Sequence, residues 1–131
     1  MLAKITVADY MTKRLVTLTK DTNVFEAVKK MLDHKITSAP VIDPQGRLLG
    51  MFSEKDGMKV FLESVYNQST SGKVGDFMTT DIIRVEADSS IVDVAEKFHQ
   101  SSVRSFPVFE DQDFVGIVSR VDVLKALLSI K

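Results

Sequence analysis

A spaced set of Gly, Ser and Asp occurs twice in the chain. The segment GMFSEKD runs from Gly50 to Asp56, and GIVSRVD runs from Gly116 to Asp122. In both, Ser and Asp follow an apolar run, at the place where a helix would begin. A serine hydroxyl there can accept a hydrogen bond from a free amide, and an acid favours the positive end of a helix. Ser-x-x-Asp is therefore a candidate helix cap.

The same groups could also hold a ligand. A carboxylate in the first helical turn can accept both hydrogens of a vicinal diol such as ribose, as an acid does in dinucleotide-binding folds. A hydroxyl and free amides at a helix start suit phosphate. Gly50 and Gly116 stand inside the apolar runs, where glycine weakens a strand and often marks a close backbone approach. Their repetition with Ser and Asp favours a ligand site over a cap alone.

The chain consists of two copies of one sequence unit, so the same secondary-structure elements should position these residues in each copy. One copy begins VADYMTKRLVTL at Val7 and the other VGDFMTTDIIRV at Val74. A unit of this length buries little surface and is marginal alone, so the two copies should share a core. We predict one repeat at residues 1–66, a polar linker at 67–73 and a second repeat at 74–131.

Each copy is predicted to be strand–helix–strand–strand–helix, an α/β (α+β) fold. The short runs LVTL and IIRV are candidate strands, APVI and FPVF are strands that open with proline, and LLGMF and FVGIV are strands covered on both faces,. The turns PQG and DQD connect the last two strands of each copy.

Two amphipathic helices are expected in each copy. Apolar residues at helical spacing start at Val24 in the first copy and at Ile91 in the second,. Asp21 or Thr22 would cap the former, and Ser89 or Ser90 the latter. The final helices run over about residues 54–66 and 120–129. The last one is apolar on two sides, so one side can face its own sheet and the other a second copy or another chain.

Composition narrows the classes of function. The 131 residues are 44% hydrophobic and 27% charged, with a formal net charge of -1 and no cysteine. We expect a globular protein with no disulfide, no nucleic-acid partner and no membrane association. The start of the chain lacks a secretory pattern, so a cytoplasmic location is predicted. No nucleophile–base set or phosphate-binding glycine loop is visible, and the two histidines lack matched partners, so neither an enzyme nor a metal site is expected.

The whole chain, from about Val7 to Ser129, resembles a tandem pair of cystathionine-β-synthase (CBS) domains, also called a Bateman module. The resemblance rests on DYM and DFM at each start, SAPVID and SFPVFE in the middle, and the two Gly-x-x-Ser-x-x-Asp segments. It implies two repeats packed with pseudo-two-fold symmetry, a homodimer, and a regulatory role without catalysis. It also implies a cleft between the repeats that takes AMP, ADP, ATP or S-adenosylmethionine, with no required cofactor.

The resemblance assigns roles residue by residue. Asp56 and Asp122 would hold ribose hydroxyls, and Ser53 and Ser119 would contact ribose or phosphate. The residues implied around base, sugar and phosphate are Thr17, Thr37, Ala39 and Pro40 in one site and Arg84, Arg104, Phe106 and Pro107 in the other. Arg104 would bind phosphate, and Thr37 takes its place in the first copy. Arg84 either adds phosphate affinity or blocks the site.

Two hypotheses therefore remain. The first is an adenosine-nucleotide-sensing regulatory module that acts on a partner protein. The second is a structural or dimerisation module in which the Ser-x-x-Asp pairs are only caps. The sequence leaves open which nucleotide binds, whether one or both sites fill, what is regulated, and whether the chain is part of a larger protein.

Overall fold

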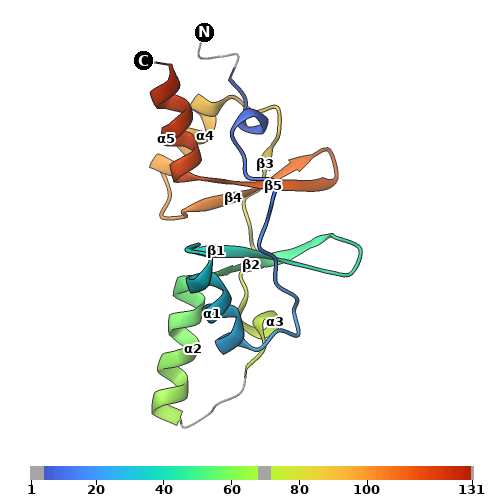
Figure 1. Ribbon diagram of the computed structural model, residues 1–131, viewed down its shortest axis with the longest axis vertical. Helices are drawn as coiled ribbons and strands as arrows, with labels where there is room; N and C mark the ends of the chain where they lie inside the picture. Colours follow the sequence, from blue (N-terminus) through green and yellow to red (C-terminus); the bar gives the residue numbers. More distant parts are fainter. Residues whose placement is uncertain (1–4, 68–71, 131) are drawn as a thin grey trace. The chain divides into compact units, whose positions relative to one another are not determined.

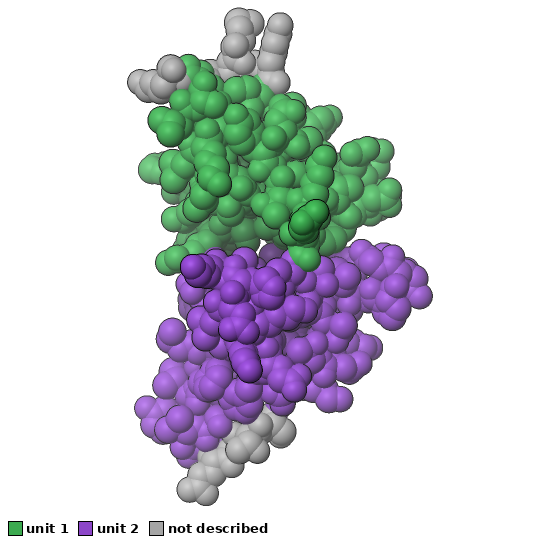
Figure 2. All heavy atoms as spheres, in the orientation of Figure 1, with its two compact units in different colours: residues 1–15, 83–131 green, residues 16–82 purple. Residues whose placement is uncertain are grey.

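The two repeats exchange their opening segments. The computed structural model describes residues 5–67 and 72–130, and its chain divides into two compact units (Figures 1 and 2). Unit 1 takes the residues up to Leu15 together with those from Ile83 onward, and unit 2 is Val16–Ile82. We call residues 5–15 and 72–82 the opening segments. Each unit thus joins the body of one repeat to the opening segment of the other.

Unit 2 is a two-stranded sheet covered by helices. Strand β1 (Ser38–Ile42) pairs antiparallel with β2 (Leu48–Ser53), and helices α1 (Val24–Asp33) and α2 (Glu54–Asn67) flank them in the chain. The short helix α3 (Val74–Phe77) comes from the opening segment of the second repeat. The buried core consists of Leu18, Val24, Ala27, Met31, Ala39, Val41, Phe52, Val60 and Val74.

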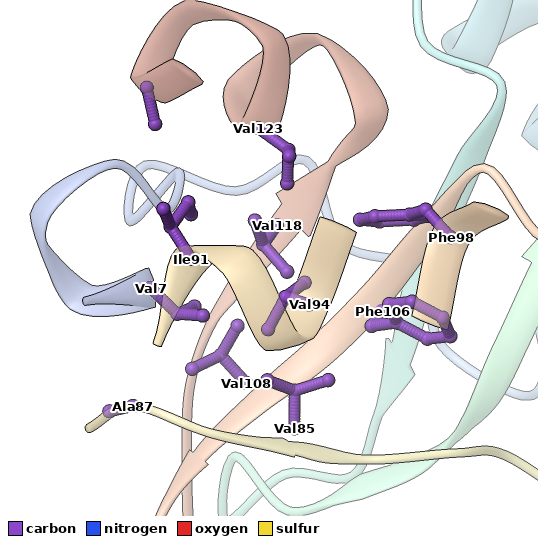
Figure 3. Packing of buried hydrophobic residues seen from close by; sticks show 11 residues of the cluster. Val7, Val85, Ala87, Ile91, Val94, Phe98, Phe106, Val108, Val118 and Val123 are labelled. Carbon is purple, nitrogen blue, oxygen red and sulfur yellow. The ribbon is translucent and has the colours of Figure 1, made fainter. Parts of the chain in front are cut away.

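Unit 1 repeats this plan with a third strand. Its elements are the 3-10 helix η2 (Val7–Asp9), β3 (Val85–Glu86), α4 (Ile91–His99), β4 (Ser105–Glu110), β5 (Asp113–Ser119) and α5 (Arg120–Ser129). The sheet order is β3-β4-β5, in which β3 is parallel and β5 antiparallel to β4. Figure 3 shows Val7 of the opening segment among the core side chains of α4, β4 and β5. Complete burial of a valine contributes about 1.5–3 kcal/mol, so the opening segment is part of the core of this unit.

The predicted helices are confirmed, but one of the predicted caps is wrong. Asn23 caps α1, because its side chain accepts hydrogen bonds from the amides of Phe25 and Glu26. The hydroxyl of Thr22 instead accepts from the Thr19 amide at 3.2 Å. In the second copy Ser90 caps α4, as predicted. The short helices η2 and α3 were not predicted.

The first strand of each copy is shorter than predicted. In LVTL only Leu18 pairs, as a parallel bridge to Val41, and its amide donates to the Pro40 carbonyl at 2.9 Å. In IIRV only Val85 belongs to a strand, the two-residue β3. The carbonyl of Thr17 accepts a hydrogen bond from Lys30 Nζ at 2.9 Å, so a side chain takes the place of a strand partner there.

The prolines lie inside their strands and do not open them. Pro40 is opposite Met51, and Pro107 is opposite Ile117. Met51 exchanges hydrogen bonds with Thr79, and Ile117 exchanges them with Thr12. A proline has no amide hydrogen to donate. The residue opposite each proline exchanges backbone hydrogen bonds with the opening segment of the other repeat.

The predicted linker falls partly outside the described residues. Helix α2 ends at Asn67, and residues 68–71 are not described. The Gly72 carbonyl accepts from the Val24 amide at 3.0 Å, and the Val74 amide donates to the Thr22 carbonyl at 2.9 Å. The last part of the predicted linker is therefore tied to the start of α1. Among the described helices, none is long and apolar enough to cross a membrane.

Candidate functional site

Both Ser-x-x-Asp pairs form reciprocal helix caps. In unit 2 the Ser53 amide donates to Asp56 Oδ2 at 2.9 Å, and the Asp56 amide donates to Ser53 Oγ at 3.2 Å. In unit 1 the Ser119 amide donates to Asp122 Oδ2 at 2.9 Å, and the Asp122 amide donates to Ser119 Oγ at 3.1 Å. This arrangement is a capping box with Asp in place of Glu. The capping role predicted from sequence is confirmed in both copies.

The caps leave one oxygen of each carboxylate available. Within the described parts of the chain, the hydrogen bonds accepted by Asp56 and Asp122 all go to Oδ2, and none reaches Oδ1. A carboxylate can accept about four hydrogen bonds. All four Ser and Asp residues are partly exposed. Each acid can therefore keep its capping bond through Oδ2 while Oδ1 accepts a hydroxyl of a ligand.

The two glycines of the repeated pattern allow the opening segments to dock. A Cβ on Gly50 would lie 2.7 Å from the Thr79 carbonyl oxygen, and one on Gly116 would lie 2.8 Å from that of Thr12. Real Cβ atoms do not approach a backbone oxygen so closely. The close backbone approach predicted from these glycines is confirmed. Its partner is the opening segment of the other repeat.

Thr12 is a polar residue of this site that the sequence argument missed. Its amide donates to the Ile117 carbonyl at 2.7 Å, and the Ile117 amide donates back to the Thr12 carbonyl at 3.0 Å. The Thr12 hydroxyl then lies 3.5 Å from Asp122 Oδ2. The available signal was the pair Met-Thr, which recurs at the same place in both opening segments.

In unit 2, β1 carries several of the predicted ligand residues to the start of α2. The Thr37 carbonyl accepts from the Glu54 amide at 2.8 Å, which fixes the strand to the first turn. Ala39 and Pro40 follow on β1, opposite Phe52 and Met51. The Ala39 side chain is in the core, so this residue can offer a ligand only its backbone.

Unit 1 brings the equivalent residues to the start of α5. The Arg104 carbonyl accepts from the Arg120 amide at 3.1 Å. Phe106 is 1% exposed and packs on Phe98 with ring centroids 4.4 Å apart (Figure 3). Pro107 is also fully buried. Phe106 and Pro107 therefore shape the core beneath the site, and only their backbone groups remain for a ligand.

Arg84 is engaged by the turn between β4 and β5. Its Nη2 donates to the Asp111 carbonyl at 2.5 Å, and its guanidinium carbon lies 3.7 Å from the centre of the Phe109 ring. Its Nε also lies 3.4 Å from a Glu86 carboxylate oxygen. A phosphate contact by Arg84 requires the side chain to leave these three partners.

A cavity in unit 1 has none of the predicted ligand residues in its lining, although Arg84 contacts three of the residues that line it. Its volume is about 390 Å³, and it is lined by Thr6, Ala8, Glu86, Ala87, Asp88, Phe109, Glu110 and Asp111. Four of these side chains are acidic, so the cavity would repel a phosphate group. None of the twelve residues that the resemblance implies is among them.

The two halves of the chain match one protein family. The family model described as CBS domain matches residues 7–63 and residues 74–129. The chain belongs to the CBS domain family. Its CBS repeats thus cover nearly all of the chain, and the resemblance seen in the sequence is confirmed, as is the α+β fold class.

Curated proteins similar to this CBS pair include CBS domain-containing proteins. The CBS domain-containing protein CBSX3, mitochondrial, of Arabidopsis thaliana is 31% identical over 115 residues, which are 84% of this chain and 55% of that protein. The chain spans 42%, 55% and 32% of the length of the first three curated relatives that it matches. It therefore corresponds to about a third to a half of those proteins.

Two solved structures of similar CBS pairs contain adenosine compounds. CBSX2 from Arabidopsis thaliana, in complex with AMP, has 30% identity and a TM-score of 0.82, and the match covers 95% of this chain and 97% of that one. The CBS domain pair of MJ0100, in complex with 5'-methylthioadenosine and S-adenosyl-L-methionine, has 25% identity and a TM-score of 0.82, with 97% and 98% covered.

Proposed function

We propose that this CBS pair is a regulatory module that binds an adenosine nucleotide or S-adenosylmethionine at the starts of α2 and α5. The observation that carries the proposal is the repeated capping pair whose acid keeps Oδ1 available beside an exposed helix start. Solved relatives that bind AMP, 5'-methylthioadenosine and S-adenosylmethionine support the class of ligand. Which of these compounds binds is left to experiment.

The proposed roles follow the chemistry of the groups. Asp56 and Asp122 accept ribose hydroxyls through Oδ1, because an ionised carboxylate oxygen is a strong acceptor for a hydroxyl donor. Ser53 and Ser119 stand at helix N-termini, where the amide dipoles favour a phosphate. The remaining residues of the two proposed sites are Thr17, Thr37, Ala39 and Pro40 with the first pair, and Arg84, Arg104, Phe106 and Pro107 with the second. Their placement in a cleft between the repeats stays a prediction.

The module is proposed to act by binding rather than by catalysis. A ligand shifts a conformational equilibrium only by its difference in affinity for the two states, so the output would be a change in contact with a partner protein. No resident cofactor is proposed. The cytoplasmic location also stays a prediction.

Exposed apolar residues on α5 support the predicted homodimer. One stripe of α5 packs in the core through Val123 and Ala126. The other stripe is open, with Val121, Leu124 and Leu128 exposed by 57%, 65% and 74%. Large apolar patches on a surface mark interaction sites. We therefore retain a homodimer as part of the proposal.

Calorimetric titration tests the binding function directly. The purified chain should bind at least one of AMP, ADP, ATP and S-adenosylmethionine with a saturable heat, and GMP serves as the control for recognition of the base. If the chain unfolds cooperatively on heating but takes up none of the four compounds, the ligand proposal is wrong and the dimerisation hypothesis remains.

A further inference from the structure

The side chain of Arg120 holds the loop between α4 and β4 against the start of α5. Its Nε donates to the Val103 carbonyl at 3.1 Å, and its Nη2 donates to the Ser101 carbonyl at 2.9 Å. Its amide donates to the Arg104 carbonyl at 3.1 Å. The first residue of α5 thus binds three carbonyls of the loop. Because the guanidinium is planar and its donors have a fixed arrangement, these bonds restrict the backbone path of residues 101–104.

The equivalent residue of the first repeat cannot make the side-chain bonds. Glu54 begins α2 as Arg120 begins α5, and its amide donates to the Thr37 carbonyl at 2.8 Å. The backbone bond is therefore built in both units. An ionised carboxylate, however, only accepts hydrogen bonds, so a side-chain bond from this position to the loop carbonyls is possible only in unit 1.

The restricted loop carries a basic residue to the start of α5. Arg104 stands where the first repeat has Thr37, and it is exposed. The next residue, Ser105, pairs with Ser119, the cap of α5. A long exposed side chain loses conformational freedom when it binds a ligand. A backbone that is already fixed reduces the part of this cost that comes from the loop.

The arginine that fixes the loop therefore occurs in the same unit as the arginine that the loop carries. We propose that Arg120 is a positioning residue, which fixes Arg104 for contact with the phosphate of a nucleotide bound at the start of α5. The inference rests on the proposed function, in which Arg104 belongs to this site. Arg120 acts through its hydrogen bonds to the loop and does not itself contact the ligand.

The ratio of the Kd of adenosine to the Kd of AMP measures this role, because the two ligands differ only in the phosphate. A residue that only stabilises the fold would weaken both ligands alike. Loss of a hydrogen bond to a charged group raises Kd roughly tenfold or more, so Arg104→Ala should lower the ratio by about that factor. Arg120→Ala should lower it roughly three- to tenfold, since Arg104 remains but its backbone is less restricted.

Calorimetric titrations in an Asp56→Ala parent isolate the site at α5, because this substitution removes the acid of the other proposed site. Arg120→Ala should lower the ratio and speed hydrogen exchange at the amide of residue 120. Arg120→Lys keeps the charge but lacks the fork of donors, so its ratio should also lie below that of the parent. Lys125→Ala removes the same charge from an exposed residue farther along α5. It is the matched control and should leave the ratio unchanged.

A double-mutant cycle separates positioning from a direct effect of the Arg120 charge. In an Arg104→Ala background, Arg120→Ala should change the ratio little, because the residue that it positions is gone. If Arg120→Ala lowers the ratio equally with and without Arg104, its effect does not pass through Arg104, and the inference is overturned.

The remaining outcomes are also decisive. An unchanged ratio in Arg120→Ala overturns the inference, as does a ratio in Arg120→Lys equal to that of the parent, which would assign the effect to charge alone. Arg120→Gln provides a second variant should the alanine disturb folding, and thermal melting without ligand checks both. If the parent binds neither AMP nor adenosine, the inference fails. The wild-type titration with the four proposed ligands then shows whether the proposed function fails as well.

Discussion

At the scale of single residues, capping and ligand binding are compatible at Ser53–Asp56 and Ser119–Asp122. Each acid uses Oδ2 to accept the amide of the preceding serine. A helix cap of this kind stabilises the helix locally by accepting hydrogen bonds from free amides. The second carboxylate oxygen makes the same side chain a potential acceptor for a sugar hydroxyl, and the capping bond through Oδ2 positions the side chain for that role.

Substitution of Asp122 should affect both properties. Asp122→Ala removes the bond to the Ser119 amide, so we expect the free energy of unfolding to fall by about 0.5–2 kcal/mol. In an Asp56→Ala background, which removes the acid of the other proposed site, it should also abolish the increase in melting temperature caused by AMP, because the sugar acceptor is lost. Both quantities can be measured by thermal unfolding with and without the nucleotide.

Ser90→Ala is the matched control for Asp122→Ala. Ser90 caps α4 of the same unit by accepting from the Val92 amide at 3.2 Å, so its loss should cost a similar amount of stability. The nucleotide-induced shift should survive. A shift that also survives Asp122→Ala in the Asp56→Ala background would mean that Asp122 is only a cap.

At the scale of elements, the strand pairs are completed by the opening segments. Residues Met51 and Ile117 lie opposite prolines, and their backbone groups pair with Thr79 and Thr12 instead. The glycine beside each pairing site leaves room for the incoming carbonyl. The glycine, proline and threonine at these positions thus all contribute to docking of the opening segment on the strand pair.

Gly116→Ala should disturb this docking. Its new Cβ would meet the Thr12 carbonyl at 2.8 Å, and moving that carbonyl breaks its bond with Ile117. We expect a loss of about 1–3 kcal/mol in stability, as for overpacking, and faster hydrogen exchange at the Thr12 and Ile117 amides.

Gly46→Ala provides the comparison for Gly116→Ala. Gly46 has a φ of +83°, and no other group lies within 4 Å of the place that an alanine methyl would take. Alanine there has only the conformational cost of a left-handed residue, about 1–2 kcal/mol. Exchange at the Thr12 and Ile117 amides should remain slow relative to global unfolding. Equal acceleration in both variants would contradict the docking role of Gly116.

At the scale of the whole molecule, the exchange makes each unit depend on both repeats. Val7 is completely buried in the core of unit 1, and Val74 is completely buried in that of unit 2. Each repeat therefore carries both a docking surface and an opening segment of the kind that docks on such a surface. In this chain, however, the segment docks on the other repeat.

An isolated second repeat lacks the opening segment of the first repeat, so we expect two copies of it to pair with each other. A fragment of residues 74–131 contains Val74 and Thr79, which can dock beside Gly116 of a second copy, so we expect a dimer formed by segment exchange. Sedimentation equilibrium measures its mass. A fragment of residues 83–131 retains the exposed stripe of α5 but lacks the segment, and it should not form the same dimer.

The result that would contradict this expectation is a cooperatively folded monomer of residues 74–131. Dimerisation of both fragments would instead assign the contact to the α5 stripe. Gly116→Ala in the longer fragment should weaken an exchange dimer and leave a dimer through α5 unaffected.

Local sequence patterns predicted an element correctly where a single physical requirement explained the spacing of its residues. The apolar spacing from Val24 and from Ile91 predicted α1 and α4, because such a stripe has to be buried. The cap of α1 was misplaced, since Asp21, Thr22 and Asn23 all have suitable side chains, and only the fold decides which amides each can reach. The length of LVTL was overestimated because strand pairing depends on a distant partner.

The sequence alone determined the repeat, the helix starts and the close approach at Gly50 and Gly116, because these features depend on local spacing and backbone chemistry. Only the tertiary structure decided what approaches those glycines. The opening segments dock on the other repeat through contacts between residues distant in the chain, such as Thr12 with Ile117. Both repeats carry the same motif, so the sequence could not distinguish docking within a repeat from exchange between repeats. The Ser and Asp pairs were predicted, and Thr12 beside Asp122 became visible only with that exchange.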